Sequence, residues 1–224
     1  MSDPNPYATP RAAAVPATDD ISRQMQGLHW PLTFSFKILA LASQATVTDA
    51  SGRVVCFTKQ KPFKFKEHVE IFNDKSKTTL LAEIKTKKVI DWSARYHFTD
   101  ATGNDLGSVG RRGWRSIWRA HYEVFNPGDD NVDYSIREEN PASKFFDGLF
   151  GGIPVIGMAS GYLFHPRYAA TKTGGNIAMR MTKKAAFFEG RFEIEKLEQS
   201  LTHHQELNLV LSYMMMVLLE RKRG

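Results

Sequence analysis

A long, mostly apolar segment lies near the end of this 224-residue chain. From residue 207 to residue 219 only Asn208 and Ser212 interrupt a run of Leu, Met, Val and Tyr, and the run contains neither Pro nor Gly. Leu and Met favour a helix, and a helix that is apolar on every side must be buried in a protein core or in lipid. A bilayer span needs about 20 apolar residues, and this run is shorter. The pattern therefore predicts a core helix over residues 199–220, with a membrane tail anchor as the alternative.

Short apolar stretches that alternate with polar residues fill most of the chain between Phe34 and Glu195. They form pairs around turn sequences at residues 49–52, 73–76, 100–103 and 126–129. Hairpins at this short spacing predict an antiparallel meander rather than βαβ units. A sheet that closes into a barrel around the last helix would bury all faces of that helix at once. We therefore predict a mainly β fold, a closed antiparallel β-barrel around a buried C-terminal helix.

A weak internal repeat adds to this picture. Residues 48–56 and residues 171–179 both read as strand, glycine turn and strand, and both are followed by a lysine and then an aromatic residue. Such self-similarity suggests a barrel built from two related halves. Chance similarity between hairpins is the alternative.

Two segments depart from the strand pattern. Residues 1–27 are rich in Pro, Ala, Ser, Thr and Asp and have little to bury, so we expect a disordered tail before a single domain over residues 28–224. A Gly-rich apolar insertion at residues 141–165 is expected to close one end of the barrel, or alternatively to contact lipid. The N-terminus lacks the basic and apolar regions of a secretory signal. Cys56, the single cysteine, fits a reducing compartment and a buried thiol, so we expect a cytoplasmic protein, peripheral at membranes.

Taken together, the order of these features resembles the superfamily shared by tubby C-terminal domains, LURP-one-related proteins and phospholipid scramblases. The segments that carry the resemblance are the hairpin at 47–54, the approach at 187–195, the helix at 207–219 and the ending at 219–224. The likeness covers about residues 34–224 and lies nearest to the LURP-one-related and scramblase-like branch. It implies a barrel of about twelve strands threaded by the last helix.

The resemblance also points toward membranes. Tubby domains bind phosphoinositides through basic residues, and scramblases are linked to lipid movement and calcium. In this chain residues 202–205 read Thr-His-His-Gln where a calcium-type acidic segment would precede the last helix. The phosphoinositide-binding residues of tubby domains do not map onto this chain position by position.

Charge is spread unevenly along the chain, whose formal net charge is +6. Residues 53–119 hold fifteen Lys/Arg and seven Asp/Glu, whereas residues 126–150 hold two and six. Each basic side chain near an anionic membrane contributes about 1 kcal/mol of attraction, so clusters of them are candidate headgroup sites. The candidate lipid-binding residues are Lys59, Lys61, Lys64, Lys66, Arg111, Arg112 and Arg115. A solvated barrel surface is the alternative, and nothing in the chain resembles a reader of nucleic-acid bases.

Patterns typical of catalysis or metal binding are missing from the sequence. His203 and His204 are adjacent, so they cannot form the i, i+4 metal pair of a helix. The series Asp129, Asn131 and Asp133 lacks the glycine and the final glutamate of a calcium loop, which favours an ordinary acidic turn. We therefore expect a non-enzymatic barrel without a cofactor or metal, which binds anionic phospholipid headgroups or acts as a membrane-proximal scaffold. The alternatives are a scramblase-like, membrane-anchored lipid transport protein and a protein-interaction module.

Overall fold

The computed structural model describes residues 23–37, 43–60, 68–86, 94–111, 121–139, 166–186 and 189–220. Within these ranges lie twelve strands and one long helix. The strands are β1 (Leu32–Lys37), β2 (Ser43–Thr48), β3 (Val54–Gln60), β4 (His68–Phe72), β5 (Leu80–Lys85), β6 (Arg95–Asp100), β7 (Asp105–Arg111), β8 (His121–Phe125), β9 (Val132–Glu138), β10 (Arg167–Lys172), β11 (Ile177–Lys184) and β12 (Glu189–Lys196). The helix is α4 (His203–Glu220).

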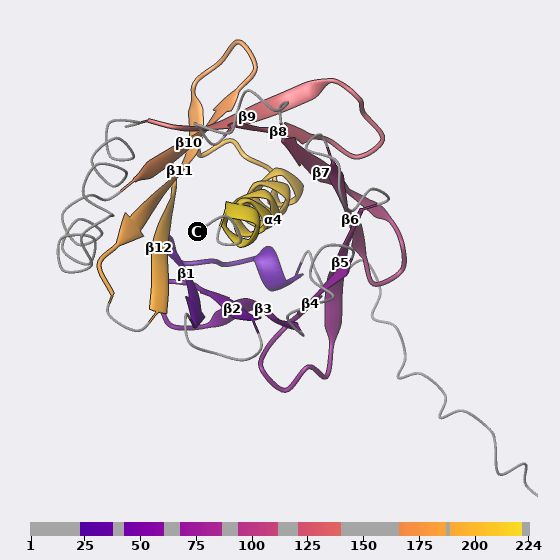
Figure 1. Ribbon diagram of the computed structural model, residues 1–224, viewed down its shortest axis with the longest axis vertical. Helices are drawn as coiled ribbons and strands as arrows, with labels where there is room; N and C mark the ends of the chain where they lie inside the picture. Colours follow the sequence, from indigo (N-terminus) through magenta and orange to yellow (C-terminus); the bar gives the residue numbers. More distant parts are fainter. Residues whose placement is uncertain are drawn as a thin grey trace, which may run out of the picture.

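The twelve strands form one closed antiparallel barrel. Each strand pairs with its neighbour along the chain, and β1 pairs with β12 to close the sheet, with Leu32 opposite Ile194 and Phe34 opposite Phe192. Figure 1 shows the yellow helix α4 enclosed by the ring of strands. The predicted fold, a closed antiparallel barrel of about twelve strands around the C-terminal helix, is therefore confirmed.

Helix α4 is buried along nearly its whole length, from Glu206 to Leu218. Apolar side chains on the inner face of the barrel surround the helix, so a helix without a polar face is stable there. The Tyr213 side chain bonds to the barrel: its hydroxyl lies 3.0 Å from the backbone oxygen of Tyr168 and 2.9 Å from that of Met179. Among the described residues, no helix is long and apolar enough to cross a membrane.

The helix begins later than the pattern predicted, at His203 rather than residue 199. Thr202 and Gln205 form a reciprocal cap: the Gln205 N–H donates to Thr202 Oγ1 at 3.3 Å, and the Thr202 N–H donates to Gln205 Oε1 at 3.1 Å. Such a pair satisfies backbone donors that a helix start leaves without partners.

The five hairpins share one irregularity beside their turns. In β2–β3 the register shifts by one residue between Val47 and Thr48, and in β10–β11 it shifts in the same way between Ala170 and Thr171. The equivalent shift occurs in β4–β5, β6–β7 and β8–β9. The repeat noted in the sequence thus reflects a bulge common to all five hairpins, and the division into two related halves stays a prediction.

The chain before β1 requires a correction to the predicted tail. Residues 23–25 form a helical turn, and the Met25 side chain is only 2% exposed in the core. The Gln24 amide donates to the backbone oxygens of Val54 and Val55 at 2.9 Å and 3.0 Å. Residues 23–27 therefore belong to the folded domain, because one large apolar side chain and three polar contacts are enough to dock this short segment. The remainder of the predicted tail, residues 1–22, and the insertion at 141–165 lie outside the described residues.

Candidate functional site

The barrel has two chemically different ends. The turns after β2, β4, β6, β8 and β10 lie at one end, here called the turn end, where α4 begins. The other end of the barrel is here called the connection end, and α4 finishes there. At this end β1 finishes and β2 begins, and the same holds for β3 and β4, β5 and β6, β7 and β8, β9 and β10, and β11 and β12.

At the turn end, two aspartates repeat the same hydrogen-bonded cap. Oδ1 of Asp49 accepts from the Ser51 N–H (2.9 Å), the Ser51 hydroxyl (2.6 Å) and the Arg53 N–H (3.0 Å). Oδ1 of Asp100 accepts from the equivalent groups of Thr102 and Asn104 at 2.7 to 2.9 Å. Burial alone would raise the pKa of Asp49, but the hydrogen bonds outweigh it and lower the pKa to about 2. The same causes lower the pKa of Asp100.

Charge differs between the two kinds of segment that join the strands. The five turn segments between paired strands contain three Lys/Arg and four Asp. In the sequence, the six segments that join one hairpin to the next contain nine Lys/Arg and four Asp/Glu, and most of these residues lie outside the described part of the chain. Along the sequence, basic residues are therefore concentrated in the connecting segments, whereas the turns are close to neutral.

Of the seven candidate lipid-binding residues, Lys59 and Arg111 lie in the described part of the chain, whereas Lys61, Lys64, Lys66, Arg112 and Arg115 lie outside it. Lys59 is exposed near the end of β3, opposite Gln44. Arg111 is the last residue of β7, four strands further round the barrel. The structure thus places both residues at the connection end but does not bring them together.

Arg111 occupies a different environment from the outer surface expected of a headgroup ligand. Its side chain is 8% exposed, its Nη2 lies 3.9 Å from Oε1 of Glu220, and its guanidinium stands 5.9 Å from the centre of the Tyr122 ring. Side chains two residues apart on a strand lie on the same face, so Arg111 points inward as Val109 does. Its role in this structure is to hold the end of α4.

The cluster around Glu220 was not predicted from the sequence. The Tyr122 hydroxyl donates to Glu220 Oε1 at 2.7 Å, and burial, followed by the neighbouring carboxylate, raises the pKa of Tyr122 well above its usual range. A carboxylate at a helix C-terminus is unfavourable against the helix dipole, so Arg111 and Tyr122 supply the compensating contacts. No local signal links Tyr122 to Glu220, because they are far apart in sequence. The alternation of side chains along β7 is the one sequence feature that could have indicated that Arg111 points inward.

A second buried ion pair fixes the start of the helix. Lys196 Nζ lies 2.8 Å from Oε1 of Glu206, whose side chain is 4% exposed, and 5.8 Å from the centre of the Trp30 ring. His203 Nδ1 lies 3.4 Å from the other oxygen of Glu206. Both ends of α4 are thus attached to the barrel by charged groups, while apolar packing holds the middle.

One group of metal-ligating side chains lies on the outer face of β4 and β5. Donor atoms of His68, Glu70 and Glu83 lie within 4.8 Å of one another in the part of the chain that the structure describes. His68 Nε2 is 2.7 Å from Glu83 Oε1, and Lys85 Nζ is 2.6 Å from Glu83 Oε2. Although partial burial would raise the pKa of Glu83, these two neighbours lower it. Because His68 and Lys85 already pair with the two oxygens of Glu83, we assign this group to surface ion pairing.

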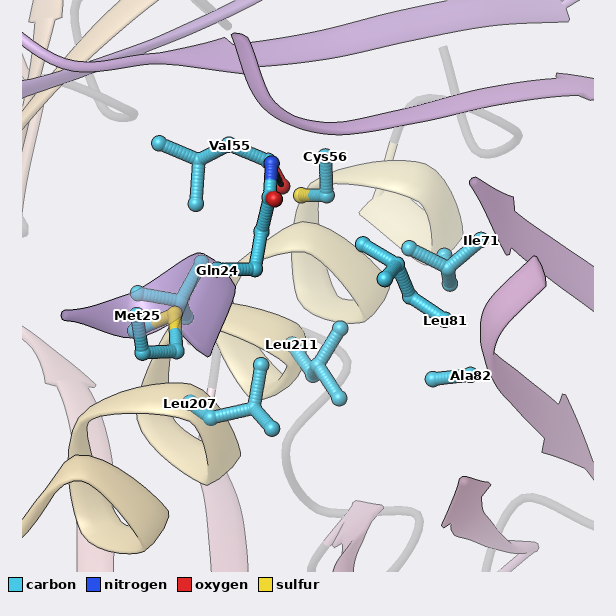
Figure 2. Close-up of a pocket in the computed structure, with 10 residues that line it drawn as sticks. Gln24, Met25, Val55, Cys56, Ile71, Leu81, Ala82, Leu207 and Leu211 are labelled. Carbon is cyan, nitrogen blue, oxygen red and sulfur yellow. Dashed lines mark hydrogen bonds between the residues drawn. The ribbon is translucent and has the colours of Figure 1, made fainter. Parts of the chain in front are cut away.

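Cys56 lies inside the barrel, in agreement with the prediction of a buried thiol. It is 3% exposed, and burial raises its pKa to about 12, so it is a poor nucleophile at neutral pH. It lines a small apolar cavity together with Met25, Ile71, Leu81 and Leu211 (Figure 2).

The series Asp129, Asn131 and Asp133 includes the acidic turn between β8 and β9. There the Asn131 N–H and side-chain amide both donate to Asp129 Oδ1 at 2.8 Å.

Comparison with known proteins agrees with one part of the resemblance. Residues 54–150 match the LURP-one-related family. This match confirms the LURP-one-related resemblance drawn from the hairpins and the last helix. An X-ray structure of a protein from Arabidopsis thaliana also matches, with 11% sequence identity and a TM-score of 0.47, over 89% of this chain and 96% of that one. No curated protein gives a significant match to the chain.

Proposed function

We propose that this LURP-one-related barrel binds anionic phospholipid headgroups with its connection end, without catalysing a reaction. The observation that carries the proposal is the difference in charge between two sets of sequence segments, with nine Lys/Arg against four Asp/Glu in the connections and three against four in the turns. In this proposal the protein is cytoplasmic and meets membranes peripherally.

Each basic residue is attracted only weakly to an anionic membrane, but the contributions of several residues add up. Each Lys or Arg near an anionic surface contributes about 1 kcal/mol, and the attraction fades over about 8 Å at physiological salt. Lys59 is the exposed, described candidate at the connection end; the candidates Lys61, Lys64, Lys66, Arg112 and Arg115 belong to the connections by sequence. Arg111 does not contribute directly, because its guanidinium faces Glu220.

Sedimentation with vesicles of phosphatidylcholine alone, or with one quarter phosphatidylserine, tests the proposal. We expect binding to the anionic vesicles only, and we expect it to weaken steeply as salt rises. The double variant Lys64→Ser with Arg112→Ser should bind about thirtyfold more weakly, since two charges contribute about 2 kcal/mol.

The matched control removes two exposed lysines from the turn end, Lys75→Ser with Lys172→Ser, and so changes the net charge equally. It should leave vesicle binding within about twofold of wild type. Equal losses in both double variants would mean that net charge alone attracts the protein. Indifference of the wild type to anionic vesicles at low salt would reject the proposal and favour a protein-interaction module. Release only by detergent would favour the scramblase-like, membrane-anchored alternative.

A further inference from the structure

The barrel is most weakly paired where β3 meets β4. Along every other seam the described strands face each other at four or more positions, whereas β3 and β4 pair only at Phe57 and Phe72. Toward the connection end β3 continues to Gln60 and β4 starts at His68, without further ladder pairs between the described residues of these strands. Fewer ladder bonds oppose separation here than elsewhere in the barrel.

The packing behind this single pair is also incomplete. Cys56 and Ile71, which directly precede Phe57 and Phe72 on their strands, line the small apolar cavity of about 10 Å³ drawn in Figure 2. Side chains that border a void lose part of their van der Waals contact on that side. Two separate features, the sparse ladder and the void behind it, therefore weaken the barrel at the same place.

Residues 23–27, here called the clasp, cover this place from inside the barrel. Figure 1 shows them as the short indigo helical turn within the ring of strands. The buried Met25 side chain lines the same cavity as Cys56 of β3 and Ile71 of β4, so it faces both strands of the seam (Figure 2). Leu211 of α4 lines this cavity as well. The clasp therefore packs between the helix and the two strands where their own pairing is sparse.

The clasp is attached to β3 by side-chain hydrogen bonds and belongs to no strand. The Gln24 amide donates to the backbone oxygens of Val54 and Val55 at 2.9 Å and 3.0 Å, and Arg53 Nη2 donates to the backbone oxygen of Gln26 at 3.0 Å. Short segments held by a few such bonds open at lower free energy than the strands of a closed sheet. The clasp can therefore leave while the rest of the barrel stays folded.

We propose that the clasp controls a local opening of the barrel at the β3–β4 seam. While the clasp is docked, Met25 holds β3 and β4 together from inside. When the clasp leaves, the single Phe57–Phe72 pair separates before any other seam, and Cys56 and the Leu211 side of α4 become accessible. Anything that displaces the clasp shifts the barrel toward this open form. This inference does not depend on headgroup binding, because it concerns the clasp and the seam rather than the basic connections.

Two measurements on the full chain follow the clasp and the seam separately. Modification of Cys56, the only cysteine, by methyl methanethiosulfonate reports departure of the clasp. Amide hydrogen exchange at residues 58–60 and 69–71 reports separation of β3 from β4. In the wild type we expect these amides to exchange faster than those of β10 and β11, and nearly independently of low urea concentrations, because a local opening exposes little surface. Equal protection of both pairs of strands would overturn the weak seam.

Gln24→Ala tests the clasp, because it removes both hydrogen bonds from the Gln24 amide to β3. It should raise the rate of Cys56 modification and the rate of exchange at the seam about tenfold each. Gln26→Ala makes the same change at an exposed side chain of the clasp, whose bond to Arg53 uses the backbone oxygen, so both rates should stay within about twofold of wild type. Faster modification without faster exchange at the seam would show that the clasp leaves without opening the barrel, and would overturn the proposal.

Met181→Ala separates this local opening from unfolding of the whole barrel. Met181 is buried on β11 and is not among the residues that line the cavity beside the clasp, so its truncation destabilises the barrel elsewhere. We expect faster exchange in β10 and β11, while Cys56 modification stays within about twofold of wild type. Equal acceleration of both would mean that Cys56 is reached only when the whole barrel unfolds, and would overturn the clasp.

Discussion

Asn208 of α4 donates its side-chain amide to the backbone oxygen of Phe125 at 2.9 Å, inside the barrel. Ser212, one turn later, lies 3.5 Å from Asn208 Oδ1. Because α4 is apolar on all sides, apolar packing alone would tolerate several rotations of the helix about its axis. The buried backbone oxygen of Phe125 needs a hydrogen-bond donor, and this need selects one of these rotations. The Asn208–Phe125 bond therefore sets the orientation in which the helix fits the barrel.

Gly107 makes this approach possible and gives the first prediction. A Cβ at Gly107 would stand 2.4 Å from Asn208 Nδ2 and 2.6 Å from the Phe125 oxygen, and its φ of +108° already disfavours other residues. Gly107→Ala should lower the free energy of unfolding by about 3 kcal/mol, measured by denaturant titration. Gly110→Ala, on the same strand, places its Cβ no nearer than 3.7 Å to other atoms and should change stability by less than about 0.5 kcal/mol. Similar losses in both variants would contradict the packing argument.

The helix itself is required for folding. Leu211 is 0% exposed, so Leu211→Asp places an unpaired charge in the apolar core and should abolish cooperative thermal unfolding, a loss above about 4 kcal/mol. Leu197→Asp makes the same chemical change at a site that is 42% exposed and should retain a sharp transition. Truncation before residue 207 should leave insoluble or molten protein. A soluble truncated barrel that melts cooperatively would show that α4 is dispensable.

Two N-terminal deletions should behave differently. Removal of residues 2–22, which the composition predicts to be a solvated tail, should change the melting temperature by less than about 2 °C. Removal of residues 2–27 also deletes Met25, a buried methionine, and should cost about 2–4 kcal/mol. Differential scanning calorimetry of both variants checks this expectation. Equal stability of the two would show that Met25 contributes little to the core.

Local patterns predicted the barrel because hairpins and an all-apolar helix are local features. The turn at 49–52 and the run at 207–219 each carry their meaning within a few residues. Contacts between distant segments could not be predicted in this way. Met25 was assigned to a tail because one methionine in a polar segment carries no periodicity, although the barrel supplies the walls that bury it.

The candidate site shows the same limit. Arg111 was grouped with neighbouring arginines by sequence distance, yet alternation along β7 turns its side chain toward Glu220, whose position only the barrel defines. Lys59, which was grouped by sequence with Lys61, Lys64 and Lys66, is an exposed residue of β3. Charge along the chain thus indicates basic connections, but the direction of each side chain depends on strand register.

The aspartate caps at the turn end predict a dependence of stability on acid. The pKa of Asp49 is about 2 in the folded protein and about 3.9 in an unfolded chain, so its ionised form stabilises the fold. A depressed folded pKa gives a contribution that is fully present above about pH 5 and is lost as pH falls through about 2, about 2.6 kcal/mol in total. Asp49→Asn should flatten the stability profile in this window. Ser51→Ala removes a 2.6 Å hydrogen bond to Asp49 and should move the acid transition to higher pH. An unchanged profile in both variants would count against the cap.

Lys59 and Arg111 should separate vesicle binding from stability. Lys59 is exposed at the connection end, so Lys59→Ser should weaken binding to anionic vesicles about fivefold while changing the free energy of unfolding by less than about 0.5 kcal/mol. Arg111 is buried against Glu220 and Tyr122, so Arg111→Ser should lower stability by about 2 kcal/mol yet leave vesicle binding of the folded protein nearly unchanged. In the Glu220→Gln background the stability loss from Arg111→Ser should shrink, because the partner charge is already absent. A loss of vesicle binding in Arg111→Ser without a loss of stability would place its guanidinium at the membrane instead of at the end of α4.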